Sequence, residues 1–135
     1  MTLEEVNVEA AKKFIELYNE GKPDYADHSH SKDAQWVELP FLGPTGRSGD
    51  VEFLKEMAVS ACETFPDRKI QISKIIGQSD SVVIDCEWAG TLSHDFEIEN
   101  RTLKMGDVLK INIVFFLKFR DQKIIQETDY CTLTT

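Results

Sequence analysis

Apolar residues recur at helical spacing in two stretches of the first half of the chain. Between residues 2 and 20 they follow the i, i+3, i+4, i+7 rule, and Thr2 and Glu5 have the spacing of a capping box. The same rule holds from residue 50 to 64, and Pro66 ends that pattern because proline cannot continue a helix. Both stretches therefore predict amphipathic helices, each with one apolar face against a core.

The second half of the chain is rich in β-forming residues. Four runs are predicted to be strands: 69–76, 81–92, 108–119 and 124–133. Before them, residues 23–30 have room for a short helix, Gln35–Leu39 is predicted to be a strand, and residues 40–49 are a loop rich in Gly and Pro. Helices followed by hairpin-linked strands are typical of an α+β fold. No linker or repeat divides the chain, so residues 1–135 are expected to form one domain.

The run that begins at Val108 alternates between two kinds of face. One face is entirely apolar: Leu109, Ile111, Ile113, Phe115, Leu117 and Phe119. The other face is half apolar: Lys110, Asn112, Val114, Phe116 and Lys118. We expect the first face to be fully buried in the core. The second face would leave Val114 and Phe116 exposed in a single subunit, which predicts a homodimer packed through the outer face of the sheet.

Composition and charge limit the kinds of binding partner and the cellular location that we expect. The formal net charge of −9, with no local Lys/Arg cluster, argues against nucleic-acid binding. No apolar run approaches the ~20 residues that a membrane span needs, and the N-terminus has no signal-peptide pattern, so a cytoplasmic location is expected. Cys62, Cys86 and Cys131 are widely spaced without a CxxC pair and are predicted to be reduced thiols. No metal site and no cofactor is expected.

Several short segments, in this order, carry a resemblance to a known family. They are residues 14–21 (Phe-Ile-Glu-Leu-Tyr-Asn-Glu-Gly), 33–40, 46–47, 65–67 and 123–130. Their order and spacing resemble the nuclear-transport-factor-2-like superfamily, and within it the SnoaL-like and ketosteroid-isomerase-like groups. The resemblance covers nearly the whole chain. It implies a cone in which a curved antiparallel sheet wraps over N-terminal helices and encloses an apolar pocket for a small apolar molecule.

The isomerase chemistry of that superfamily does not carry over to this chain. It needs a carboxylate base and an oxyanion hole made of a Tyr and a protonated Asp. The matching positions here hold Phe14 and Phe115, whose rings donate no hydrogen bond, and alignment on Pro40 places Leu39 at the base. We therefore expect no steroid-type isomerisation. Counting from the start of the segment instead places Glu38 at the base, where a β-bulge would turn it inward; a solvated carboxylate beside the pocket mouth is the favoured alternative.

The related epoxide hydrolases use an Arg-x-Asp pair on a strand together with a later Asp. The inward positions of the matching strand are predicted to be Val82, Ile84, Cys86 and Trp88, which supply neither group. Only the acid of the closing Asp129-Tyr130 pair remains. Epoxide opening by that triad is therefore excluded.

Two acids near the C-terminus are the best candidates for chemistry. The resemblance places Ile125, Glu127, Asp129 and Cys131 on the concave face of the sheet. A carboxylate there would be poorly solvated, which raises its pKa and suits general acid/base catalysis on a carbonyl compound. Asp129 is the first candidate and Glu127 the second. The alternative is a one-residue slip of the strand, which would turn Ile124 and Tyr130 inward and both acids outward.

The remaining candidates form the walls of the pocket. The predicted ligand-binding residues are Phe14, Tyr18, Leu39, Cys86, Trp88, Ile113, Phe115 and Cys131. Tyr18 is predicted to be a wall residue, with donation of its hydroxyl to a ligand as the alternative. The three histidines are expected at the surface, although His30 near the mouth could pair with a pocket acid.

Two functions are consistent with these features. One is a SnoaL-like pocket protein with Asp-based acid/base catalysis. The other is a non-catalytic ligand-binding or dimerisation module that has lost the active site. The inward acids favour the first function, which is the prediction, and the apolar residues at the isomerase positions favour the alternative.

Overall fold

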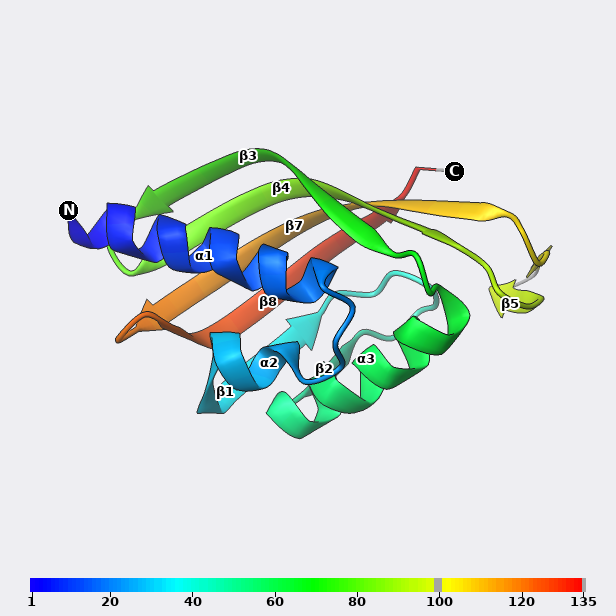
Figure 1. The fold of residues 1–135 in the computed structure, drawn as a ribbon, viewed down its shortest axis with the longest axis horizontal. Helices are drawn as coiled ribbons and strands as arrows, with labels where there is room; N and C mark the ends of the chain where they lie inside the picture. Colours follow the sequence, from blue (N-terminus) through cyan, green and yellow to red (C-terminus); the bar gives the residue numbers. More distant parts are fainter. Residues whose placement is uncertain (99–100, 135) are drawn as a thin grey trace.

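The computed structural model describes residues 1–98 and 101–134 (Figure 1). Its helices are α1 (Leu3–Asn19), α2 (Tyr25–Ser29) and α3 (Val51–Thr64). Its strands are β1 (His30–Glu38), β2 (Arg47–Gly49), β3 (Lys69–Gln78), β4 (Ser81–Thr91), β5 (Phe96–Ile98), β6 (Arg101–Leu103), β7 (Val108–Arg120) and β8 (Lys123–Leu133). The long strands curve over α1, and α3 lies below them in Figure 1. This is the expected α+β cone.

The main sheet is mixed rather than purely antiparallel. Its strand order is β2-β1-β8-β7-β4-β3, and every neighbouring pair is antiparallel except β1 and β8. The β1–β8 pair joins the two halves of the chain and is the only one among the described strands that runs parallel. It brings the residues of β1 beside the acids of β8.

The predicted helix signals are present as hydrogen bonds. Oγ1 of Thr2 accepts from the backbone N–H of Glu5 at 3.2 Å, and Oε1 of Glu5 accepts from the backbone N–H of Thr2 at 3.3 Å. Gly21 follows α1 with φ of 79°, a left-handed conformation that favours glycine. Oδ1 of Asp50 caps α3 by accepting from Phe53 N–H at 3.0 Å.

The two faces of β7 differ as their alternation predicts. All six apolar residues of the inner face are buried, each 8 % exposed or less. On the outer face Phe116 is 47 % exposed, whereas Val114, which was also predicted to be exposed, is half-buried. The inner face therefore packs against the core, while part of the outer face is exposed to solvent in this single chain.

A β-bulge interrupts the pairing of β8 with β7. Phe119 is opposite Ile124 and Lys118 is opposite Gln126, so Ile125 is the extra residue. The prediction that Ile125 lies on the concave face is wrong, because the bulge shifts the alternation there. Ile124 is fully buried instead, and the residues beyond the bulge keep Glu127 and the acid after it inward.

The short and irregular strands were the least predictable. β1 begins at His30, five residues before the predicted start, and β2 lies within the predicted loop at 40–49. β2 pairs with β1 through Trp36 opposite Gly49. Three-residue strands such as β2, β5 and β6 are too short to show an alternating pattern. Within the described residues, no helix combines the length and apolar character that a membrane crossing requires.

Candidate functional site

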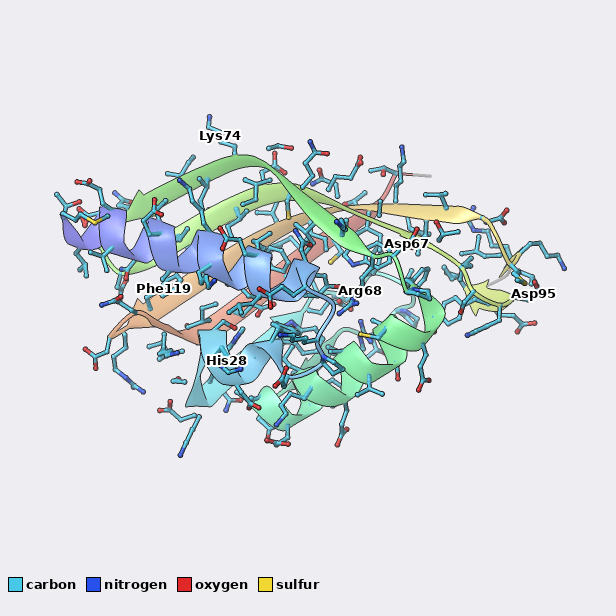
Figure 2. The ribbon with its side chains drawn as sticks, in the orientation of Figure 1. His28, Asp67, Arg68, Lys74, Asp95 and Phe119 are labelled. Carbon is cyan, nitrogen blue, oxygen red and sulfur yellow. The ribbon has the colours of Figure 1, made fainter. Side chains whose placement is uncertain are left out.

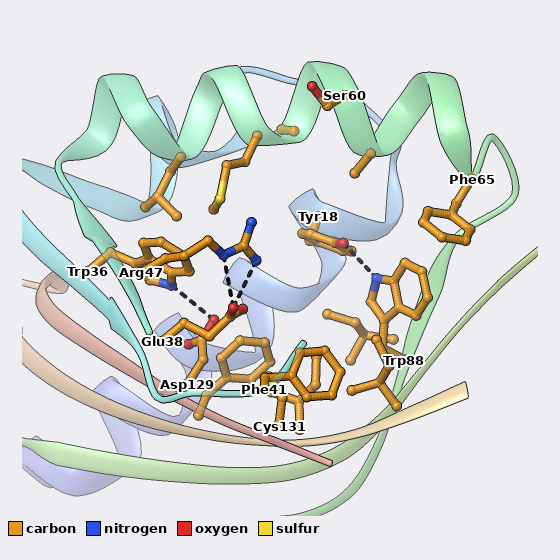
Figure 3. A pocket seen from close by; sticks show the side chains of 18 of the residues that line it. Tyr18, Trp36, Glu38, Phe41, Arg47, Ser60, Phe65, Trp88, Asp129 and Cys131 are labelled. Atoms are coloured by element: carbon orange, nitrogen blue, oxygen red, sulfur yellow. Dashed lines mark hydrogen bonds and ion pairs between the residues drawn. The ribbon is translucent and has the colours of Figure 1, made fainter. Parts of the chain in front are cut away.

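A cavity of about 360 Å³ lies between the concave face of the sheet and the helices (Figure 3). This volume is within the usual range for small-molecule sites. The predicted site residues that line it are Phe14, Tyr18, Trp88, Ile113, Phe115 and Cys131, with the acids Glu38, Glu127 and Asp129. Most of the remaining wall is apolar and includes Leu54, Met57, Phe65, Leu109 and Ile111.

Two predicted wall residues lie elsewhere. Leu39 is 39 % exposed, because the inward positions of β1 are Ala34, Trp36 and Glu38 and the next residue faces away. Cys86 faces inward but is covered completely by the core, where its Sγ donates a hydrogen bond to the carbonyl oxygen of Ile113 at 3.3 Å. Neither residue lines the cavity.

Asp129 presents a carboxyl group with one free oxygen. It comes from the inward face of β8, opposite Phe115, and is 8 % exposed. Its Oδ2 accepts a hydrogen bond from Nε1 of Trp36 at 2.9 Å, whereas its Oδ1 is buried without a partner. Burial raises the pKa of Asp129 well above its ordinary value, and the neighbouring Glu127 carboxyl raises it further. This carboxyl is therefore equipped to hold a proton near neutral pH.

Glu127 is bonded to a buried histidine behind the cavity wall. Its Oε1 lies 2.7 Å from Nε2 of His30, and Nδ1 of His30 lies 2.7 Å from Oγ of Ser29. Burial raises the pKa of Glu127 to about 7 and lowers the pKa of His30 to about 4, so between these two pH values the pair holds one proton and is neutral as a whole.

One arrangement of hydrogens satisfies this chain. The Glu127 carboxyl donates to Nε2 of His30, Nδ1–H donates to Ser29, and the Ser29 hydroxyl donates to the Tyr25 carbonyl oxygen at 3.3 Å. His30 is thus a buried partner of Glu127 and not the expected surface histidine, since it is only 4 % exposed. Its predicted alternative, a pairing with a pocket acid, is what the structure shows.

Glu38 lies at the mouth beside an arginine. Its side chain is 12 % exposed and lines the cavity, and its Oε1 accepts from Nε and Nη2 of Arg47 at 3.0 and 2.8 Å. The Arg47 guanidinium also lies 5.6 Å from the centre of the Trp36 ring. Because this carboxylate already has a cationic partner, it is less available to a ligand than Asp129.

A phenol lies on the other side of the cavity from Asp129 (Figure 3). The Tyr18 hydroxyl oxygen accepts a hydrogen bond from Nε1 of Trp88 at 2.8 Å. The guanidinium carbon of Arg68 lies 4.8 Å from the centre of the Tyr18 ring. We call Tyr18, Trp88 and Arg68 the phenol end of the cavity, and Asp129, Glu127 and Trp36 its acid end.

Trp36 and Arg68 are not among the residues predicted from the sequence to form the site. Period-two alternation through Ala34 and Glu38 is the signal that would have placed Trp36 inward. Arg68 carries no local signal, because it meets the Tyr18 ring only in the folded chain. The pairing of His30 with an acid was predicted only as the alternative to a surface position. Among residues 1–98 and 101–134, no group of three or more His, Cys, Asp or Glu side chains is arranged to hold a metal ion.

Comparison with known proteins agrees with this architecture. The model of the SnoaL-like polyketide cyclase family matches residues 8–135. The chain belongs to this family. A search of curated proteins finds no match.

Solved structures of the same fold are distant in sequence. AclR from Streptomyces galilaeus is 14 % identical with a TM-score of 0.80, covering 97 % of this chain and 81 % of its own. IdmH from Streptomyces antibioticus is 19 % identical with a TM-score of 0.75, covering 93 % and 91 %. An epoxide hydrolase from M. tuberculosis is 11 % identical with a TM-score of 0.71, covering 95 % and 84 %. These likenesses confirm the nuclear-transport-factor-2-like fold predicted from the sequence. The family and its neighbours support a pocket protein of the cyclase and isomerase type.

Proposed function

We propose that the cavity binds a small, mostly apolar carbonyl compound and that Asp129 moves a proton at the carbon next to the carbonyl group. The observation that supports this most is Oδ1 of Asp129, a buried acceptor on the cavity wall without a hydrogen-bond partner. In the step proposed, Asp129 reacts in its ionised form. Its Oδ1 takes the proton, the electron pair of the C–H bond forms a C=C bond, and the electron pair of the C=O bond moves onto oxygen to give an enolate. Return of the proton from Asp129 to another carbon of the enolate completes an isomerisation. In a cyclisation the enolate carbon instead attacks a second carbonyl of the ligand, and Asp129 returns the proton to the alkoxide that forms there.

The other two acids have supporting parts in this proposal. Burial raises the pKa of Glu127 to about 7, so below that pH Glu127 is mostly protonated toward His30 and adds little negative charge next to Asp129. Glu38 is held by Arg47 at the mouth, where the pair would contact the more polar end of a ligand. Steroid-type isomerisation stays outside the proposal, because Phe14 and Phe115 offer no hydrogen-bond donor.

Proton exchange in 2-tetralone tests the proposal without knowledge of the natural substrate. Its acidic C–H bonds exchange for deuterium in D2O, and ¹H NMR follows the loss of signal. We expect the protein to accelerate this exchange and Asp129→Asn to reduce the acceleration by at least ~100-fold, a usual contribution of general-base catalysis. Asp85→Asn is the matched control, because Asp85 lies on β4 next to the fully buried Cys86 and faces the other side of the sheet.

The second candidate function is a non-catalytic binding module. The apolar residues at positions 14 and 115 favour it, since they remove the donors used by isomerase-like relatives. Binding of 2-tetralone, seen by quenching of tryptophan fluorescence, with exchange no faster than an equal concentration of acetate produces would support this candidate and refute the catalytic one.

We also propose that two chains pack through the outer face of the sheet. Val108, Phe116 and Tyr130 are 46 %, 47 % and 45 % exposed there, and an obligate interface would cover well over ~1,000 Å² in total. Light scattering at micromolar concentration should give a dimer mass that Phe116→Lys reduces to that of a monomer. A monomeric mass for the unaltered protein would refute the dimer.

A further inference from the structure

The phenol end of the cavity contains a hydroxyl group whose hydrogen has no acceptor among the described residues. A phenol has one hydrogen to donate and lone pairs to accept. The Trp88 indole N–H can only donate, so its 2.8 Å contact occupies the acceptor side of Tyr18. Among the hydrogen bonds of the described residues, none has Tyr18 as the donor. Because Tyr18 lines the cavity, its O–H is free to donate to whatever occupies that space.

A buried cation, Arg68, lies next to the ring that carries this hydroxyl. Arg68 is 3 % exposed, and its Nε and Nη2 have no hydrogen-bond partner. No carboxylate of the described residues forms an ion pair with it; its guanidinium instead lies over the Tyr18 ring at 4.8 Å. An uncompensated buried cation favours any negative charge that forms close to it. Burial raises the pKa of Tyr18 although the charge of Arg68 partly opposes the rise, so the phenol keeps its hydrogen.

Together these contacts form a preorganised donor site. We propose that the Tyr18 hydroxyl, positioned by Trp88 and backed by the charge of Arg68, binds the oxygen atom of the ligand and stabilises negative charge on it. The ligand class is a carbonyl compound that forms an enolate, or a phenol that ionises. This inference rests on the proposed function in its choice of ligand. The Tyr18 hydroxyl would supply the hydrogen-bond donor that the rings of Phe14 and Phe115 lack. Fixed donors aimed at a developing oxyanion lower the barrier to its formation.

Naphthols provide a probe of this site that requires no catalysis. 2-Naphthol and a more acidic ring-halogenated 2-naphthol are planar, fit an aromatic cavity and change their ultraviolet absorbance when they ionise. The experiment uses an Asp129→Asn background, in which the acid end cannot take the proton of the probe. Tryptophan quenching gives each dissociation constant, and absorbance of the bound probe gives the fraction that is ionised.

We expect the more acidic naphthol to bind more tightly and to be more ionised when bound than when free at the same pH. Adding Tyr18→Phe should weaken its binding about tenfold and return its ionised fraction to that in solution, as expected for the loss of a charge-assisted hydrogen bond. Adding Arg68→Met should lower the ionised fraction while parent 2-naphthol still binds. Tyr25→Phe is the matched control: it removes a hydroxyl from another buried tyrosine, whose ring contacts Tyr18 edge-on, and should leave the preference for the acidic probe unchanged.

Two outcomes would overturn the inference. One is an ionised fraction that does not depend on the Tyr18 hydroxyl. The other is an equal loss of preference in the Tyr25→Phe control. If Tyr18→Phe does not fold by circular dichroism, Arg68→Met and Trp88→Phe carry the same test, and an unchanged ionised fraction in both refutes the site. Tyr18-dependent binding without 2-tetralone exchange would keep this site and refute the proposed catalysis, so the two failures are distinguishable.

Discussion

Each end of the cavity contains a tryptophan whose indole N–H bonds to a polar side chain. At the acid end Trp36 donates to Oδ2 of Asp129 at 2.9 Å, and at the phenol end Trp88 donates to the Tyr18 hydroxyl at 2.8 Å. Although the donor is the same at both ends, the hydrogen-bonding group left for a ligand differs. The carboxyl group keeps an unbonded acceptor oxygen, whereas the phenol keeps an unbonded donor hydrogen.

The charges behind the two ends also differ. No Lys or Arg of the described residues forms an ion pair with Asp129, and the nearby Glu127 is bonded to a histidine. At the phenol end the buried Arg68 forms no ion pair with a carboxylate of the described residues, and its Nε and Nη2 have no hydrogen-bond partner there. The comparison shows that the chemistry open to a mostly apolar cavity depends on which polar atoms remain unbonded within it, more than on how many polar residues line it.

The largest expected effect comes from breaking the acid end at Glu127. Glu127→Ala removes the partner of a His30 side chain that is fully buried and also leaves a small void, and both costs act together. We expect a loss of about 3 kcal/mol in the free energy of unfolding by urea denaturation. Glu127→Gln retains the shape and one hydrogen bond to His30, so it should cost clearly less. Equal losses in the two variants would mean that the hydrogen bond contributes nothing.

A smaller effect, of opposite sign, is expected at Asp129. Its folded pKa is raised above the unfolded one, so the folded protein keeps a proton that the unfolded chain releases. Stability should therefore fall as the pH rises from the unfolded pKa to the folded pKa, and the full penalty remains above the folded pKa. Asp129→Asn removes this penalty and should raise the melting temperature at pH 8 by about 4 °C, which corresponds to about 1 kcal/mol for a domain of this size.

The pH dependence of this change distinguishes Asp129 from its neighbours. Near pH 5.5 Glu127 and His30 hold one proton between them in the unfolded chain, as they do in the folded protein. The pair therefore contributes little to the pH dependence of the free energy of unfolding there. Melting temperatures of the unaltered protein and of Asp129→Asn should converge below about pH 4. The same offset at every pH would contradict a buried, protonated Asp129, and Asp85→Asn should show no such trend.

The smallest effect compares the two tryptophans directly. The Trp36 hydrogen bond lowers the pKa of Asp129, so Trp36→Phe should raise that pKa further, whereas Trp88→Phe should leave it unchanged. ¹³C NMR of the labelled aspartate carboxyl carbon, followed through a pH titration, measures the shift without any ligand. An equal shift in both variants would show that the indoles act on cavity solvation rather than through their own hydrogen bonds.

Much of the fold follows from local pattern, while the site depends on contacts between distant segments. The capping box, the helix ends and the two faces of β7 are visible in the order of residues, because each depends on neighbours along the chain. The inward position of Asp129 followed from family resemblance. The bond between His30 and Glu127 joins residues 97 positions apart, and it depends on the parallel pairing of β1 with β8. Arg68 follows a Phe-Pro-Asp segment with no feature that predicts burial beneath a tyrosine ring.

The extra residue in β8 has a consequence for how relatives of this chain can differ in length. Ile125 is the surplus position between Phe119 opposite Ile124 and Lys118 opposite Gln126. Deleting it would leave the two strands matched one to one, with Glu127 and its inward neighbours on their present side. Deletion of Ile125 is therefore expected to leave both acids facing the cavity, whereas deletion two positions later removes Glu127 itself. Along this strand, the tolerance of the protein to insertion and deletion changes from one residue to the next.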